Sequence, residues 1–186
     1  MSAYSRRAVL ALSMSSMLAA AACGNGVGSD GATRIDQRVQ STLAFMDQNV
    51  PASRELQDVS VGMLVMPLVT EASFGFGGSF GRGALLVRGA TVDYYSQAQG
   101  TFGLQIGAQQ YAHVLFFMTE EALQEFRTSP GWSAGANVEY ALNDQGENIG
   151  TDTNQVLSPV IGVVFGQAGL LAGASVEGTK YTRIIP

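Results

Sequence analysis

Glycine alternates with apolar side chains along several stretches of this chain, and this pattern most constrains its fold. Phe74, Phe76 and Phe80 stand between glycine and serine residues, and residues 101–108 and 132–140 show the same alternation. A period of two places the apolar side chains on one face of a β-strand. Small residues on the other face let a second strand or layer approach closely. The chain is therefore predicted to be built mainly from strands.

Further strands are predicted along the rest of the chain. Residues 61–69 form a nearly continuous apolar run in which Pro67 marks an edge or a bend. Residues 84–87 are predicted to form another strand, and residues 156–185 two or three more, with a turn at residues 166–169. Most connections are too short for the crossovers that parallel strands need. A mainly antiparallel sheet follows.

Two helices accompany these strands. Across residues 35–50, apolar residues recur every three or four positions, which indicates an amphipathic helix that Pro51 ends, and a short helical turn is predicted from Ser53. A helix between strands begins after Thr119, whose side chain can cap it, and stops before Pro130. The predicted fold class is α+β, with a mainly antiparallel β-sheet or barrel-like core, an N-terminal amphipathic helix and one helix between strands.

Residues 1–22 have the pattern of a secretory signal peptide. Arg6 and Arg7 precede an uncharged run that is short for a membrane span. The lone cysteine, Cys23, stands at the cleavage point, as in a bacterial lipoprotein box, where the cysteine becomes the acylated first residue of the mature chain. Residues 5–10 also resemble a twin-arginine export signal. We expect Cys23 to carry a palmitate-type anchor; an ordinary cleaved signal with a free cysteine is the alternative.

The mature chain divides into a flexible tether, residues 23–33, and a folded domain, residues 34–186. In lipoprotein sorting, an aspartate directly after the acylated cysteine opposes delivery to the outer membrane, and this chain has Gly24 at that position. An exported lipoprotein anchored in the outer membrane is therefore expected, on its periplasmic or its surface face. The signal holds two of the 10 basic residues and none of the 15 acidic ones, which leaves eight against 15 and a net charge of −7. That charge disfavours nucleic acid as a partner.

Motifs for catalysis and cofactors are few. One cysteine and one histidine exclude an intramolecular disulfide and multi-ligand Cys or His metal sites, and no complete phosphate-binding glycine motif is present. Residues 77–81 match G-x-S-x-G, and Ser79, Asp93 and His113 follow in the order of a hydrolase triad. A nucleophile elbow needs a helix after the serine, however, and a strand is predicted there. The acidic residues nearest to a calcium loop lack its spacing: Asp144, Glu147 and Asp152.

Three segments resemble, in order and spacing, the signatures of the SYLF lipid-binding domain, which is also known from actin-bundling relatives in yeast. They are residues 74–83, 102–109 and 169–178. The resemblance spans about residues 34–183 and is closest to bacterial secreted or lipoprotein members with one such domain. It implies lipid binding, of phosphoinositides in eukaryotic members, without enzyme activity or a cofactor. Glu71 stands where many members carry lysine, so phosphoinositide specificity is not expected here.

The predicted function is a non-enzymatic lipid-binding module tethered to the bacterial cell envelope, with membrane lipid as the partner and an envelope protein as a second candidate. The candidate lipid-binding residues are one helical stripe and three arginines: Ile35, Val39, Leu43 and Met46, with Arg38, Arg82 and Arg88. Whether the stripe packs on the sheet or contacts a membrane stays open. The alternatives are a protein-interaction lipoprotein without specific lipid binding, a small outer-membrane β-barrel and a Ser79 hydrolase.

Overall fold

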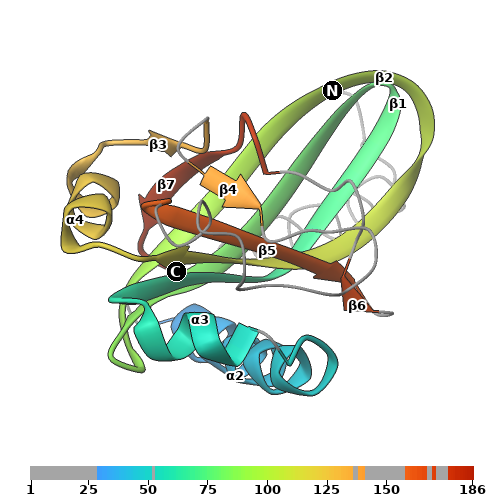
Figure 1. Cartoon of the computed structure of the whole chain (residues 1–186). Coiled ribbons are helices and arrows are strands. Elements are labelled where there is room, and N and C mark those ends of the chain that lie inside the picture. Colours follow the sequence, from blue (N-terminus) through green and yellow to red (C-terminus); the bar gives the residue numbers. More distant parts are fainter. Residues whose placement is uncertain (1–28, 52, 136–137, 141–157, 167–168, 171–175) are drawn as a thin grey trace, which may run out of the picture.

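The computed structural model describes residues 29–51, 53–135, 138–140, 158–166, 169–170 and 176–186 and has an α+β fold (Figure 1). Its helices are α2 (Gly31–Asn49), α3 (Ser53–Val59) and α4 (Glu120–Thr128). Its sheet contains β1 (Gly62–Val87), β2 (Ala90–Phe117), β3 (Trp132–Ser133), β4 (Val138–Tyr140), β5 (Val160–Gly166), β6 (Gly169–Leu170) and β7 (Lys180–Ile184). Among the helices of this part of the chain, none is long and apolar enough to span a membrane.

β1 and β2 form one long antiparallel hairpin that supplies most of the sheet. The turn between them is made by Arg88 and Gly89, whose φ angles of 51° and 78° are both positive, as a two-residue type I′ hairpin turn requires. The strands predicted separately at residues 61–69 and 84–87 are parts of the single strand β1. That separation was wrong, because the glycines between the two segments adopt extended backbone rather than turns.

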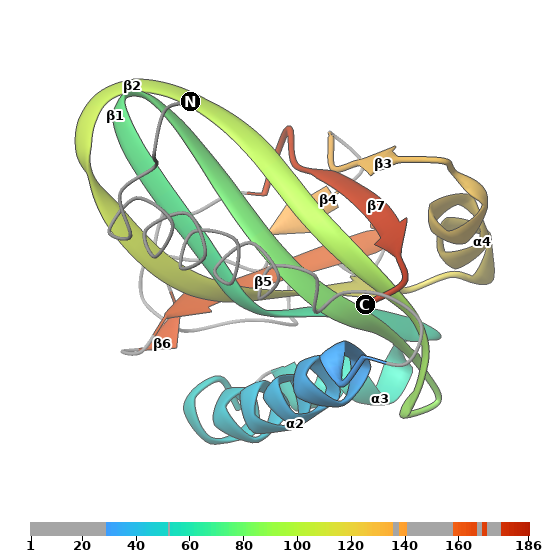
Figure 2. The same cartoon turned by 180° about the vertical axis from the view of Figure 1, so that it is seen from behind.

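The sheet is arranged around β2. One edge of β2 pairs with β1, while its other edge pairs with β7 along the first half and with β5 along the second. The pairing of β4 with β5 is parallel, and the other strand pairings in the described residues are antiparallel. Figures 1 and 2 show the β1–β2 hairpin arching over the remaining strands, so that the sheet curls into a half-barrel. The predicted antiparallel, barrel-like core is confirmed.

Two ends of the same strand, β1, lie against each other. A β-carbon on Gly83 would overlap the backbone oxygen of Val65, and one on Gly81 would lie 2.9 Å from the oxygen of Leu68. Real β-carbons are not found so close to a carbonyl oxygen, so neither position has room for a side chain. These glycines let β1 fold back onto its own beginning, and the curl of the sheet follows from that contact.

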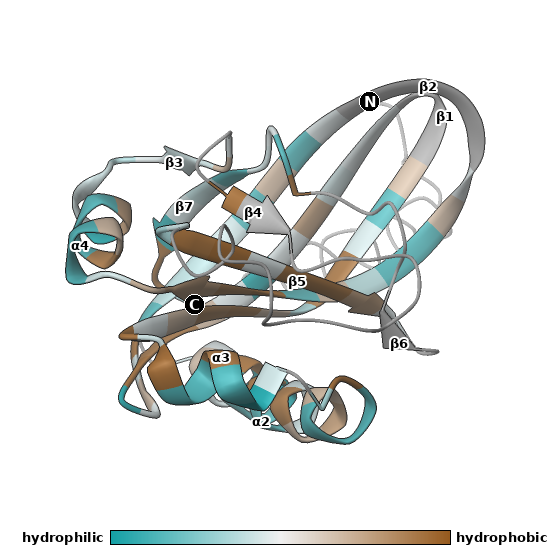
Figure 3. Ribbon diagram, viewed as in Figure 1, coloured by the Kyte–Doolittle hydropathy of each residue, from teal (hydrophilic) through white to brown (hydrophobic). Residues whose placement is uncertain are grey.

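Alternate residues of the strands serve two cores. One face, which we call the α4 core, joins Leu64 and Leu115 to α4; the other, the α2 core, joins Val65 and Val114 to α2 and α3. Six of the seven residues of β5 are buried, as expected for a strand covered on both faces, and Figure 3 shows this strand as mostly hydrophobic. The helices thus lie on opposite faces of one sheet.

α2 confirms the predicted amphipathic helix and packs on the sheet. Ile35, Val39 and Met46 are buried in the α2 core. On the same helix, Asp36 Oδ2 accepts a hydrogen bond of 2.8 Å from the hydroxyl of Tyr94 in β2. Burial, together with this bond and the negative charge of Asp36, raises the pKa of Tyr94 to about 12. The helix is therefore attached to the sheet by both apolar and polar contacts.

α4 begins where it was predicted to begin. The side chain of Thr119 accepts a hydrogen bond of 3.2 Å from the backbone N–H of Ala122, which satisfies one of the unpaired donors at the helix start. The helix ends at Thr128, shortly before Pro130. Its residue Arg127 lies 3.3 Å from the buried carboxylate of Asp93 in β2, so an ion pair holds the helix to the sheet.

We expect Gly83→Ala to lower the free energy of unfolding by about 1–3 kcal/mol or more, because the added methyl group overlaps the backbone of Val65. Gly100→Ala is the matched control, since a β-carbon there meets no atom within 4 Å; its effect should stay within about 0.5 kcal/mol. Urea unfolding of both variants measures the difference. Equal stability of the two would show that β1 tolerates a side chain at its crossing point.

Candidate functional site

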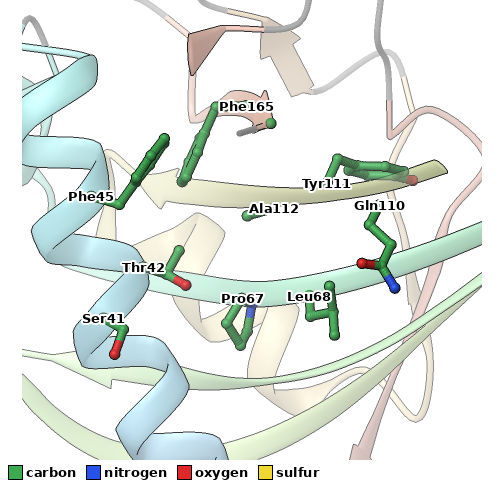
Figure 4. Close-up of a pocket in the computed structure, with 10 residues that line it drawn as sticks. Ser41, Thr42, Phe45, Pro67, Leu68, Gln110, Tyr111, Ala112 and Phe165 are labelled. Atoms are coloured by element: carbon green, nitrogen blue, oxygen red, sulfur yellow. The ribbon is translucent and has the colours of Figure 1, made fainter. Parts of the chain in front are cut away.

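A groove opens between α2 and the sheet (Figure 4). Its volume is about 250 Å³, and it is lined by residues of α2, β1, β2 and β5: Ser41, Thr42, Phe45, Pro67, Leu68, Gln110, Tyr111, Ala112, Phe165 and Gly166. This volume is below the roughly 300–1,000 Å³ that is usual for small-molecule sites. The groove therefore has room for one slender chain rather than for a bulky ligand.

A bulge in β1 forms one side of the groove. The pairing register with β2 shifts between Met66 and Val69, so Pro67 and Leu68 lie outside the regular ladder. Proline has no N–H to donate to a ladder and is tolerated at such irregular positions. Pro67 was predicted to mark an edge or a bend, and the structure shows the bend.

The walls of the groove are mostly apolar. At one end the rings of Phe45 and Phe165 are nearly parallel, at 14°, with their centroids 6.0 Å apart (Figure 4). The polar groups are the hydroxyls of Ser41 and Thr42, the amide of Gln110 and the phenol of Tyr111, and no Lys, Arg, Asp or Glu is among the ten lining residues. The groove can hold an apolar chain and hydrogen-bond an uncharged polar group, but it offers no cation to a phosphate.

Tyr111 connects the groove to the buried polar groups of the α4 core. Burial raises the pKa of its phenol, and a hydrogen bond with Ser79 acts in the opposite direction. Ser79 Oγ also accepts a hydrogen bond of 3.2 Å from Nε2 of the buried Gln97. The phenol is therefore neutral at physiological pH and is hydrogen-bonded to Ser79.

His113 is a core residue. Its Nε2 lies 2.8 Å from the hydroxyl of Tyr181, while its Nδ1 has no hydrogen-bond partner within the described ranges. Burial lowers the pKa of His113 from its ordinary 6.5 to about 3. Three other buried polar atoms in the described ranges are also unpartnered: Tyr95 Oη, Gln97 Oε1 and Thr179 Oγ1. His113 is therefore a fully buried structural imidazole.

The three residues in the order of a hydrolase triad do not form one. Ser79 lies inside strand β1, which continues to Val87, so the strand-to-helix turn of a nucleophile elbow is not formed there. Asp93 is paired with Arg127 at 3.3 Å and with Arg183 at 3.0 Å. Within the described part of the chain, Ser79 hydrogen-bonds Gln97, His113 hydrogen-bonds Tyr181 and Asp93 hydrogen-bonds Arg127, so these three residues are not joined as a triad.

The structure separates the candidate lipid-binding residues predicted from sequence. The helical stripe is part of the α2 core, with Leu43 partly buried at its margin beside the buried Ile35, Val39 and Met46. Arg38 is exposed on α2, Arg82 is half-buried on β1 and Arg88 is exposed in the hairpin turn. None of these residues lines the groove. Cys23 lies outside the described residues.

Sequence reasoning missed the groove residues. Phe45 and Phe165 are far apart in the chain, and only Pro67, a proline in an apolar strand, carried a local signal.

No group of three or more His, Cys, Asp or Glu suited to a metal ion occurs among the described residues. Asp144, Glu147 and Asp152 lie outside that part of the chain.

Comparison with known protein families places part of this chain in a described family. A family model described as "Ysc84: Las17-binding protein actin regulator" matches residues 98–183. The matched segment begins in the first half of β2, ends in β7 and includes α4 and β5. No curated protein matches the chain.

We expect stability to fall as the pH drops below 6.5, in part because of His113. The unfolded chain takes up a proton near pH 6.5, whereas the buried imidazole does so only near pH 3. The stability from neutral His113 is therefore present above pH 6.5 and is lost between these values, by up to about 1.4 kcal/mol per pH unit. His113→Gln should remove this component in urea unfolding at several pH values; parallel losses in both chains would contradict it.

Proposed function

We propose that this chain, which the match over residues 98–183 makes a member of the Ysc84 family, also called the SYLF family, is a non-enzymatic lipid-binding module. The SYLF family is a family of binding domains. The observation that carries the proposal is the groove beside α2, whose phenylalanine-walled interior and uncharged polar rim suit one acyl chain. Burying methylene groups there stabilises a complex by about 0.8 kcal/mol for each group. The placement of Ser79 within a strand supports a role without hydrolysis.

The second part of the proposal is a tether to the cell envelope. The signal-like residues 1–22 and Cys23 at their end support export and acylation, and Gly24 supports delivery to the outer membrane. Seven residues separate Cys23 from Gly31, the first residue of α2, and an extended chain spans up to about 3.3–3.6 Å per residue. The tether is long enough to keep the domain at the membrane surface without forcing one orientation.

A protein-interaction domain is the second candidate function. The description of the matching family names a Las17-binding actin regulator. That description refers to binding of a protein partner. For an exported chain the corresponding partner would be an envelope protein. The two candidates differ in what the groove does, since only the lipid-binding function requires it to be open.

We expect the chain to bind cis-parinaric acid, a fluorescent fatty acid, and Thr42→Trp to weaken this binding at least tenfold, because the indole fills the groove that Thr42 lines. Ala44→Trp is the matched control: it adds the same side chain to an exposed position of α2 and should leave binding unchanged. Fluorescence titration measures both. Absence of binding by the unmodified chain would favour the protein-interaction function.

We expect metabolic labelling with a fatty acid to mark the wild-type chain and not Cys23→Ser, because the thiol of Cys23 is the proposed attachment point. Fractionation of the host should place the labelled protein in the outer membrane. Equal labelling of both chains would show that the anchor is elsewhere, and labelled protein in the inner membrane would contradict the sorting inferred from Gly24.

A further inference from the structure

One face of the sheet continues beyond α2. Ala84 of β1 pairs with Tyr94 of β2. Ala84 is buried in the α2 core, and Tyr94 packs against that core. Further along the same face, the register places Arg82 opposite Ser96 and Phe80 opposite Ala98 on β2. β7 extends these rows, with Thr182 opposite Ser96 and Lys180 opposite Ala98. We call these six residues the docking face: Phe80, Arg82, Ser96, Ala98, Lys180 and Thr182.

The docking face is accessible and combines an aromatic ring with two cations. Phe80 is 52% exposed, an unusual position for a large apolar side chain. The Arg82 guanidinium lies 5.8 Å from the centre of the Phe80 ring, within the range of a cation–π contact. Lys180 is exposed and two strands away from Phe80, about 10 Å at the usual strand spacing. The other members are small or hydroxylated.

The charge of this face differs from that of the chain. None of its six residues is acidic, although acidic residues outnumber basic ones by 15 to 10 in the full sequence. The docking face therefore presents positive charge around an exposed ring on an otherwise acidic protein, and an acidic protein approaching an anionic surface is oriented with that side first.

We propose that the docking face binds an anionic lipid bilayer, with Phe80 entering the headgroup region and Arg82 and Lys180 contacting phosphates. This inference rests on the proposed lipid-binding function but uses a separate surface, because the groove is uncharged and shares no residue with the docking face. Aromatic side chains bind to the boundary between headgroups and acyl chains. Each cation near an anionic membrane strengthens binding about fivefold.

The test uses the full chain with Phe80→Trp, whose emission reports on the surroundings of the new indole. Adding vesicles of phosphatidylcholine with phosphatidylglycerol should shift the emission to shorter wavelength, and vesicles of phosphatidylcholine alone should not. Trp132, the single native tryptophan, is buried and gives a constant background. Val92→Trp is the matched control, because Val92 is also an exposed apolar strand residue, 41% accessible, outside the docking face; its emission should stay unchanged.

Charge is tested in the Phe80→Trp chain. Lys180→Gln and Arg82→Gln should each reduce the apparent vesicle affinity about fivefold at low salt, whereas Arg54→Gln, which removes an exposed cation from α3, should not. Urea unfolding verifies that each variant folds. An unresponsive Phe80→Trp, an equal response of Val92→Trp, or an equal loss in Arg54→Gln would overturn the docking face. If fatty-acid binding persists in that case, the proposed function stands; if it is also absent, both fail.

Discussion

The contact between the two ends of β1 determines the rest of the structure. Because Gly83 has no side chain, its backbone lies directly against the carbonyl of Val65, and a single 26-residue strand contributes to both cores from both of its ends. Leu64 and Leu85 meet in the α4 core, while Val65 and Ala84 meet in the α2 core. The curled sheet, and the opposite faces on which α2 and α4 pack, follow from this one close approach.

Local patterns predicted the element types well and their connections less well. Period-two alternation predicted the strands, and Thr119 predicted the start of α4. Glycine, however, is common in turns as well as in bent strands. The sequence therefore did not show that one strand, β1, continues through its glycines. The groove was out of reach for a different reason: Phe45, Pro67 and Phe165 come from three elements that only the tertiary fold brings together.

The same limit explains the outcome for the N-terminal helix. An amphipathic stripe shows that one face will be covered, and it does not show by what. Here the sheet covers it, and exposing a residue such as Val39 or Met46 to a membrane would first require breaking contacts that contribute about 1.5–3 kcal/mol for each large side chain. The proposed contacts with lipid therefore involve surfaces that are already open, the uncharged groove and the docking face.

The pairing of β7 with β2 also has a consequence for how the chain acquires its fold. Ser96 and Thr182 are neighbours in the sheet although 86 residues separate them in sequence. Contacts between such distant residues require closure of a long loop and slow the search for the native state. The first half of β2 has no second neighbour until β7 has been synthesised. The domain therefore completes its sheet only after the last strand of the chain has been synthesised.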